Sequence, residues 1–287
     1  GGLNLLNLPR EAMYGVDLRR VLIAGEGNKF ISADLNAIEA RVCYWLAKDT
    51  PVLDLLRQGI DIYEANARRS GLYNDPELGS FKRKAKDLRF LEKVKSLGLQ
   101  YQMGAARLKA TAMSVMGHDM TIEQAQAMVT DWRRANAPIA QLWRTLDNAL
   151  KTAIIDAAQN ESDAYLELCL PSGRVLRYCN LVEKDGNIEG QQTVLDPPEK
   201  LYPGKLLENL CQAISRDILA LAIQRIERET LGKVVLHIYD EVLVEVPSHA
   251  AEACLKQVIG ILSEAPCWAK ALPLAADGAI LEHYTKE

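Results

Sequence analysis

The spacing of hydrophobic positions changes once near the start of the chain, and the change predicts a strand followed by a helix. Residues 30–33, Phe-Ile-Ser-Ala, form a short apolar run that ends at Asp34, as in a buried strand. From 37 to 47 the apolar residues recur at the period of an amphipathic helix. A carboxylate therefore lies where a strand gives way to a helix.

The middle of the chain is predicted to be mainly helical, because its periodic stretches are bounded by residues that start or stop helices. Asp61 is a candidate cap for the helix that follows it, and Thr121, with Gln124 three residues later, forms a capping-box pattern. Residues 71–80 carry Asn-Asp-Pro and two glycines, which predicts a loop. The helical stretches run over 51–59, 61–69, 81–104, from 121 onward and 138–158.

Strands are predicted again beyond these helices. Residues 164–178 alternate around the turn Pro171-Ser172-Gly173, whereas 185–186 and 196–198 suggest irregular connections. After a long helix over 206–231, residues 234–246 alternate on both sides of Tyr239-Asp240-Glu241, as in a hairpin with an acidic tip. A final helix capped by Ser248 and a strand within 272–284 complete an α+β fold, with a small antiparallel sheet and a mostly helical insertion.

The amino-acid composition indicates a globular protein but does not indicate a function. The chain has 287 residues, 48% of them hydrophobic and 25% charged, as in ordinary globular proteins. It lacks the apolar run of about 18 residues that a membrane helix needs, so no membrane partner is expected. Its six cysteines form no CxxC pair, and with four histidines they give no zinc spacing. We expect reduced thiols and a cytosolic location.

Charge is distributed unevenly. The formal net charge is −4, yet residues 81–110 hold nine basic and two acidic residues. A local cationic segment suits polyphosphate or a nucleic-acid backbone, but on charge alone it is more typical of a solvated helix face. Within it Arg89, Lys93, Leu97 and Tyr101 recur every four positions, which keeps them near one helix face.

The acidic residues suggest a specific chemistry. Asp34 and Asp240 each end a predicted strand, and folding can bring the two together. Two carboxylates held close need a neutralising group, and Mg²⁺ takes a few carboxylates together with phosphate oxygens. Two such ions can assist an in-line phosphoryl transfer. Either residue alone is more typical of an ordinary polar strand end.

Taken in order, these patterns resemble the polymerase core of family A DNA polymerases, and most of all their bacteriophage branch. Three motifs of the family and two flanking segments are matched across nearly the whole chain. The matches are Asp34, Glu39 and Arg41 in motif A; Arg89, Lys93 and Tyr101 in motif B; Asp240 and Glu241 in motif C; and the flanks 7–10 and 204–212.

The resemblance implies a role for each matched position. The metal ligands for two Mg²⁺ ions, which Mn²⁺ can replace, would be Asp34, Asp240 and the backbone carbonyl of Leu35, with Glu241 and Lys93 as further catalytic groups. The dNTP would be bound by Glu39, Tyr63, Arg89, Lys93, Leu97 and Tyr101, and Glu39 would exclude a ribose 2′-OH. Primer–template DNA would be contacted by Arg10, Asn209, Gln212, His237 and Tyr239. Arg41 is open between an ion-pair and a functional role.

Three positions depart from the pattern of the family. Leu97 replaces an aromatic residue, Tyr239 a histidine of motif C, and Tyr63 a histidine that contacts phosphate. None of them is a metal ligand. The departures therefore bear on fidelity, sugar discrimination and rate rather than on the type of reaction.

The resemblance also implies a division of the chain. A palm would be built from 1–48 and 205–287, and fingers from 49–204. Because 33 residues precede Asp34, we expect no thumb or exonuclease domain in this chain; either would be supplied in cis before processing or in trans. The expected function is template-directed addition of dNTPs to a primer 3′-OH in a bacterial or phage-infected cytosol. The alternatives are a weak or inactive DNA-binding fragment and an RNA-synthesising relative, against which Glu39 argues.

Overall fold

The computed structural model describes residues 15, 17–117, 119–193 and 195–285. The chain divides into two compact units. The first, here called the sheet unit, comprises 1–38 and 215–287, and the second, the helical unit, comprises 39–214. The palm and fingers boundaries at 48 and 204 stay a prediction.

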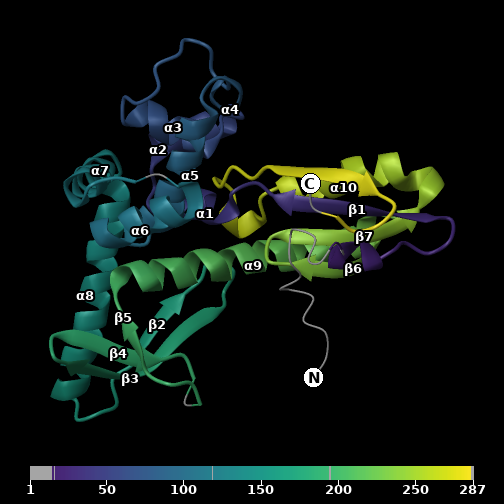
Figure 1. Cartoon of the computed structure of the whole chain (residues 1–287). Helices are drawn as coiled ribbons and strands as arrows, with labels where there is room; N and C mark the ends of the chain where they lie inside the picture. The colour runs from purple at the N-terminus through teal and green to yellow at the C-terminus, as the bar shows by residue number, and fades with distance from the viewer. Residues whose placement is uncertain (1–14, 16, 118, 194, 286–287) are drawn as a thin grey trace. The chain divides into compact units, whose positions relative to one another are not determined.

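The sheet unit is built on a four-stranded antiparallel sheet in the order β6-β7-β1-β8 (Figure 1). Strand β1 lies at its centre although its neighbours come from the other end of the chain. Along β1 the residues Ile31, Ala33 and Leu35 are fully buried, and the residues between them are more exposed. The strands are β1 (Asn28–Leu35), β6 (Lys233–Ile238), β7 (Glu241–Pro247) and β8 (Ala276–Leu281).

The two faces of this sheet are covered differently. Helix α10 (Ala251–Ser263) packs against β1 and β8, and its apolar residues Val258 and Leu262 are fully buried. On the other face Phe30, Leu243 and Tyr284 form a small apolar cluster. Asp34 shares that second face, two residues beyond Ser32 along β1, because side chains alternate along a strand. The strands predicted at 234–246 and within 272–284 are confirmed.

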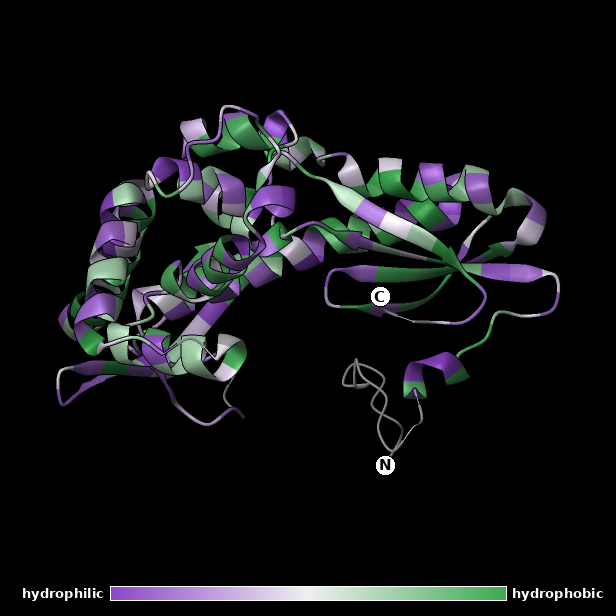
Figure 2. Ribbon diagram, turned by 45° about the horizontal axis from the view of Figure 1, so that its top comes forward, coloured by the Kyte–Doolittle hydropathy of each residue, from purple (hydrophilic) through white to green (hydrophobic). Residues whose placement is uncertain are grey.

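Helices dominate the helical unit, and most of their predicted starts are confirmed. Asp61 accepts a hydrogen bond from the backbone of Tyr63, and Thr121 forms a complete capping box with Gln124. Figure 2 shows the alternation of hydrophilic and hydrophobic residues along these helices. They are α1 (Ile38–Leu46), α2 (Thr50–Arg57), α3 (Ile62–Arg69), α4 (Phe81–Lys84), α5 (Lys86–Leu99), α6 (Ala105–Met116), α7 (Ile122–Ala135) and α8 (Ala137–Gln159).

The single helix predicted over 81–104 is wrong. The backbone leaves helical geometry at Ala85, with φ −139° and ψ 56°, and this separates α4 from α5. The backbone departs from helical geometry again after α5, where Gln102 has a φ of 65°. Gly104 then precedes the first turn of α6. Periodicity continued across both breaks because the spacing of side chains does not report one or two residues with non-helical dihedral angles.

A second antiparallel sheet, in the order β2-β3-β4-β5, belongs to the helical unit and was only half predicted. Its strands are β2 (Leu166–Cys169), β3 (Val175–Lys184), β4 (Asn187–Gln191) and β5 (Glu199–Leu201). Asp185 and Gly186 form a tight two-residue turn with φ of 50° and 72°, not an irregular connection. Strand β4 was missed because it is short and polar. It requires Gly190, where a Cβ would lie 2.5 Å from Leu181.

Helix α9 (Pro203–Glu229) contributes residues to both units. It ends two residues before the predicted limit. Ser248 was predicted to cap the last helix, but it begins a short 3₁₀ turn instead, and α10 starts after Ala250 without a side-chain cap. Among the described residues, no helix combines the length and apolar character that crossing a membrane requires.

Candidate active site

Asp34 and Asp240 come from distant parts of the sequence and meet at one end of the sheet in the sheet unit. Asp34 is paired with Glu241 in the antiparallel register of β1 and β7. The backbone N–H of Leu35 donates to the carbonyl of Asp240 at 3.1 Å. Asp240 occupies the two-residue tip of the β6–β7 hairpin, next to Tyr239, whose φ is 54°. The chain therefore brings both predicted metal-binding aspartates to adjacent backbone positions.

Glu241 is set apart from the two aspartates by burial. It is 3% exposed and lies directly opposite Asp34. Its two carboxylate oxygens accept hydrogen bonds from Ser32 Oγ at 2.6 Å and from Tyr284 Oη at 3.1 Å. These donors fix the carboxylate on the same face of the sheet as Asp34. Glu241 is thus an anchored acid rather than a solvated one.

A fourth carboxylate, Asp277, was not predicted from the sequence. In the register of β1 and β8 it stands opposite Asp34, on the side away from Glu241. It accepts a hydrogen bond from Asn36 Nδ2 at 3.0 Å, and the Asn36 backbone N–H donates to Ala275 at 2.8 Å. The predicted strand within 272–284 contained this acid, but only the register reveals which residue it faces.

The donor set at this edge fits a magnesium-type cation. Within the described residues no three histidine, cysteine or acidic side chains converge into a complete metal cage. Mg²⁺ rarely uses such a cage: it binds one or two carboxylates and keeps water or substrate phosphate as its other ligands. Asp34 and Asp240, with a neighbouring backbone carbonyl, supply ligands of that kind.

In the helical unit, Arg89 of α5 is held by two residues at the start of α3. Its Nε donates to Asp61 Oδ2, and its guanidinium carbon lies 5.0 Å from the centroid of the Tyr63 ring. The other oxygen of Asp61 caps α3 by accepting from the Tyr63 N–H at 3.0 Å. Burial raises the pKa of Tyr63, and the nearby Asp61 charge adds to this, so the phenol stays neutral. Arg89 is therefore fixed in place.

Arg41, for which the sequence left two roles open, belongs to the same neighbourhood. It is 6% exposed, and burial lowers the pKa of its guanidinium, while the Asp61 charge opposes that shift. Asp61 thus serves two arginines and one helix start. The sequence marked Asp61 only as a helix cap.

Tyr101 and Glu39 are in direct contact. The Tyr101 hydroxyl donates to Glu39 Oε2 at 3.1 Å, and the tyrosine is 9% exposed. Burial, followed by the neighbouring Cys211, raises the pKa of Tyr101 far above its ordinary value, so it remains a donor. Tyr101 lies just beyond the end of α5 rather than on it, whereas Leu97 on α5 is 54% exposed. Lys93 lies between Arg89 and Leu97 in the sequence and is partly exposed.

The predicted primer–template residues are not a single group. Gln212 on α9 and His237 on β6 are exposed, and Tyr239 at the hairpin tip is 74% exposed. Asn209, by contrast, donates from Nδ2 to the Tyr178 hydroxyl at 2.8 Å, which ties α9 to β3. Arg10 lies outside the described residues.

Comparison with known proteins relates this arrangement to one family. Residues 2–165 match the family model of DNA polymerase family A. The DNA polymerase of Bacillus phage SP02 is 32% identical over 292 residues, which covers 94% of this chain and 43% of that protein. DNA polymerase I of Pseudomonas aeruginosa is 33% identical over 112 residues, or 38% of this chain and 12% of the relative.

A solved structure is similar over nearly the whole chain. It is the POL domain of Pol1 from M. smegmatis in complex with DNA primer-template and dNTP, with a TM-score of 0.62 and 18% identity. The match covers 98% of this chain and 44% of that one, and at this identity it speaks for the fold alone. The chain spans less than half the length of these relatives. With the family model matched over more than half of its residues, the chain belongs to DNA polymerase family A.

Proposed function

We propose that this chain is the catalytic part of a template-directed DNA polymerase, which adds dNTPs to the 3′-OH of a primer. The observation that carries the proposal is the adjacency of Asp34 and Asp240 at one end of the sheet. Family membership supports the same reaction, since the relatives are named DNA polymerases. In this proposal the palm comprises 1–48 and 205–287, which include the whole sheet unit, and the fingers comprise 49–204.

Asp34, Asp240 and the carbonyl of Leu35 would hold the metal, for which we propose two Mg²⁺ ions, replaceable by Mn²⁺. When bound, such ions neutralise phosphate charge and make a hydroxyl more acidic. The chain's own contribution would be to hold the two aspartates at adjacent backbone positions before substrate arrives, which the Leu35–Asp240 backbone hydrogen bond supports. Ser32 and Tyr284 hold the Glu241 carboxylate in one position, so Glu241 would contribute a fixed negative charge on this face of the sheet.

The helical unit would provide the contacts to the triphosphate. Arg89 can form a two-pronged contact with phosphate oxygens, and Lys93, one turn further along α5, a point contact. Tyr63 takes the place of a histidine in the family pattern, and its ring supports the Arg89 guanidinium. Leu97 would contribute only apolar contact to the incoming nucleotide, because it has no ring to stack.

Glu39 is proposed as the residue that excludes a ribose 2′-OH. A carboxylate acts as a steric block only if it is held still, and the hydrogen bond from Tyr101 supports that function. This favours DNA synthesis over RNA synthesis. Among the proposed DNA contacts, Gln212, His237 and Tyr239 are exposed, whereas Asn209 would act through its contact with Tyr178.

Primer–template DNA and dNTPs are the proposed partners, in a bacterial or phage-infected cytosol. A thumb or exonuclease region, in cis or in trans, is a further proposed partner. The decisive experiment is extension of a labelled primer at low salt with Mg²⁺. Wild-type protein should extend the primer, Asp34→Asn and Asp240→Asn should not, and Asp54→Asn, which alters an exposed ion pair with Arg57, should behave as wild type.

If wild-type protein and Asp34→Asn are equally inactive, even when a thumb-bearing fragment is added, the polymerase proposal fails for this chain. Retained DNA binding under those conditions would leave a binding module without activity as the better interpretation. Comparing dNTP with rNTP incorporation separates DNA synthesis from RNA synthesis.

A further inference from the structure

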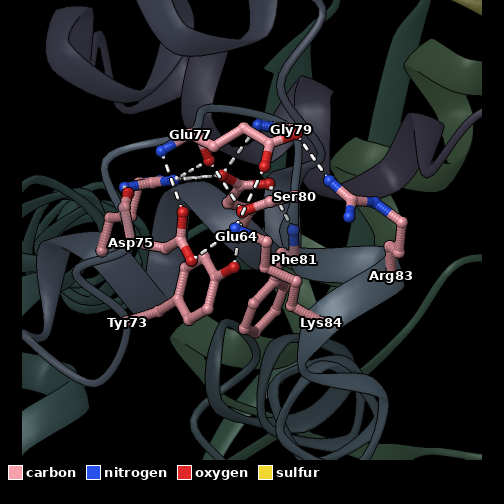
Figure 3. Close-up of polar contacts among 10 residues, drawn as sticks. Glu64, Tyr73, Asp75, Glu77, Gly79, Ser80, Phe81, Arg83 and Lys84 are labelled. Carbon is pink, nitrogen blue, oxygen red and sulfur yellow. Dashed lines mark hydrogen bonds and ion pairs between the residues drawn. The ribbon is translucent and has the colours of Figure 1, made fainter.

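The loop at 71–80 is organised around one fully buried carboxylate, Glu64 of α3. Glu64 accepts from Arg68 Nε at 2.8 Å, from the Gly79 N–H at 2.9 Å and from the Phe81 N–H at 3.2 Å (Figure 3). It is 0% exposed, so these donors replace its hydration. The contacts fix the end of the loop and the start of α4.

Further contacts fix the middle of the loop. The Arg68 guanidinium donates to the backbone carbonyls of Asp75 at 2.7 Å and Glu77 at 2.9 Å. It also lies 5.1 Å from the Tyr73 ring, which in turn packs on Phe81 with 4.7 Å between ring centroids. Because their backbone is held in this way, the carboxylates of Asp75 and Glu77 are presented in a defined direction.

Those two carboxylates are directed at two cations of α4. Lys84 Nζ lies 2.8 Å from Asp75 Oδ2 and 3.0 Å from Glu77 Oε2, and Arg83 Nη2 lies 2.5 Å from Glu77 Oε1 (Figure 3). Hydrogen bonds from Lys84 are the largest cause of the lowered pKa of both acids. The Arg83 side chain is 66% exposed and that of Glu77 53%. Exposed pairs of this kind add little to stability, so another anion can replace the carboxylates at small cost.

Two further lysines lie close in sequence to these ion-paired cations. Lys82 and Lys86 are exposed, and neither forms an ion pair with any residue described by the structure. One turn beyond Lys86 on α5, Phe90 is 39% exposed, whereas Phe30 and Phe81 are 5% and 0% exposed. Cations beside an exposed ring are the composition of a surface for single-stranded nucleic acid, on which bases stack.

We propose that the cationic edge, defined as Lys82, Arg83, Lys84 and Lys86 with Phe90, binds single-stranded DNA, and that Asp75 and Glu77 occupy it in place of phosphates when DNA is absent. Arginine and lysine bind carboxylate and phosphate oxygens by the same contacts. The inference rests on the proposed polymerase function, in which the unpaired template strand is the single-stranded ligand. Base stacking on Phe90 favours that strand over duplex.

The test compares variants by fluorescence anisotropy with a short labelled oligothymidylate at several salt concentrations. The first variant is Asp75→Asn/Glu77→Gln, which keeps side-chain size and leaves the two backbone carbonyls available to Arg68. Its matched control is Asp131→Asn/Asp147→Asn, which removes two acids from exposed pairs with Arg134 and Lys151 elsewhere in the helical unit. We expect the loop variant to bind the oligothymidylate several-fold more tightly than wild type at low salt. The control variant should show a much smaller gain in affinity. The gain should shrink as salt rises.

A second set of variants tests the edge itself. Lys82→Ala/Lys86→Ala should weaken binding several-fold and make its salt dependence shallower, because fewer phosphates are neutralised. Phe90→Ala should weaken binding of oligothymidylate more than of a blunt duplex of the same length. Both leave the Glu64 contacts untouched, and circular dichroism verifies that the fold persists.

Equal affinities for the loop variant and its control would overturn the proposal. An equal gain on the duplex would overturn its single-strand part. If wild-type protein extends primers while the loop variant and its control bind DNA with equal affinity, this inference alone fails. If the protein neither extends primers nor binds DNA in any variant, the proposed function fails as well.

Discussion

Asn36 donates a 3.0 Å hydrogen bond from Nδ2 to Asp277 Oδ2, and this contact joins the turn after β1 to the last strand of the sheet. Asp277 also stands opposite Asp34 in the register of β8 with β1. Like charges facing each other across strands are unfavourable unless a cation or donor offsets them. Asp277 therefore influences the proposed metal site without needing to be a ligand.

Replacing Asp277 should change the Mg²⁺ concentration needed for the proposed reaction more than it changes the stability of the protein. Asp277→Asn keeps an acceptor for Asn36 and removes a negative charge beside Asp34, so we expect half-saturation by Mg²⁺ to need several-fold more metal. Asp277→Ala also loses the hydrogen bond, which costs about 1 kcal/mol of unfolding free energy. Primer extension as a function of Mg²⁺, together with urea unfolding, measures the two effects. An unchanged Mg²⁺ dependence for Asp277→Asn would contradict the electrostatic role.

The contact between Tyr101 and Glu39 gives a prediction about sugar selection. Tyr101→Phe removes the donor that holds the Glu39 carboxylate and preserves the buried ring. We expect discrimination against rNTPs to fall by about tenfold, equivalent to about 1.4 kcal/mol of differential barrier. The measurement is the ratio of kcat/KM for dNTP and rNTP. Glu39→Ala is the reference: it should lower the ratio at least as far, and adding Tyr101→Phe to it should change the ratio little.

Local features of this fold could be predicted from the sequence because their signals lie within one turn or one strand. Asp61 and Thr121 cap helices where the pattern indicated, and the acidic hairpin at 239–241 forms as predicted. The break at Ala85 was not predicted because the helical spacing of side chains continues on both sides of it, and only the backbone dihedral angles of Ala85 reveal it. Strand β4 was not predicted because it is polar and is stabilised only by pairing with a strand on each side.

The sequence supplied candidate residues for the site, whose roles stay predictions, but it did not indicate the residues that contact them. A resemblance can indicate that Asp34, Arg89 and Tyr101 matter, since each matches a family motif. It does not indicate that Asp277 faces Asp34 or that Asp61 holds Arg89, because both relationships arise from tertiary packing between distant segments. Spacing also placed Leu97 and Tyr101 on one face, although α5 ends at Leu99.

Buried tyrosines predict how stability depends on pH. Burial is the largest cause of the raised pKa of Tyr44, Tyr63, Tyr101 and Tyr178. The unfolded chain releases these protons near the ordinary pKa of 10.0, whereas the folded chain releases them only at higher pH. Stability from these groups is complete below that pH and is lost as pH rises above it, by about 1.4 kcal/mol per proton per pH unit.

Urea unfolding at increasing pH checks this expectation. The midpoint should be insensitive to tyrosine ionisation on the acid side of 10.0 and fall on the alkaline side. Tyr101→Phe should make the alkaline fall shallower by about one proton's contribution. A wild-type slope that Tyr101→Phe leaves unaltered would show that this tyrosine does not resist ionisation in the folded state.

Asp61 should matter both for stability and for nucleotide binding. Its carboxylate serves Arg89, whose guanidinium it holds over Tyr63, and it lies near the buried Arg41. Asp61→Asn keeps the cap of α3, since asparagine is an equally good N-cap. It removes a negative charge close to two guanidiniums, so we expect a loss of about 1–3 kcal/mol of unfolding free energy.

The kinetic consequence of Asp61→Asn follows from the same contact. Arg89 would no longer be held in one orientation, so KM for dNTP should rise several-fold while kcat falls less. Arg89→Lys should raise KM as well, because lysine lacks the planar fork that binds two oxygens at once. If Asp61→Asn lowers stability but leaves KM unchanged, then Asp61 serves the fold through Arg41, and Arg89 finds the triphosphate without its help.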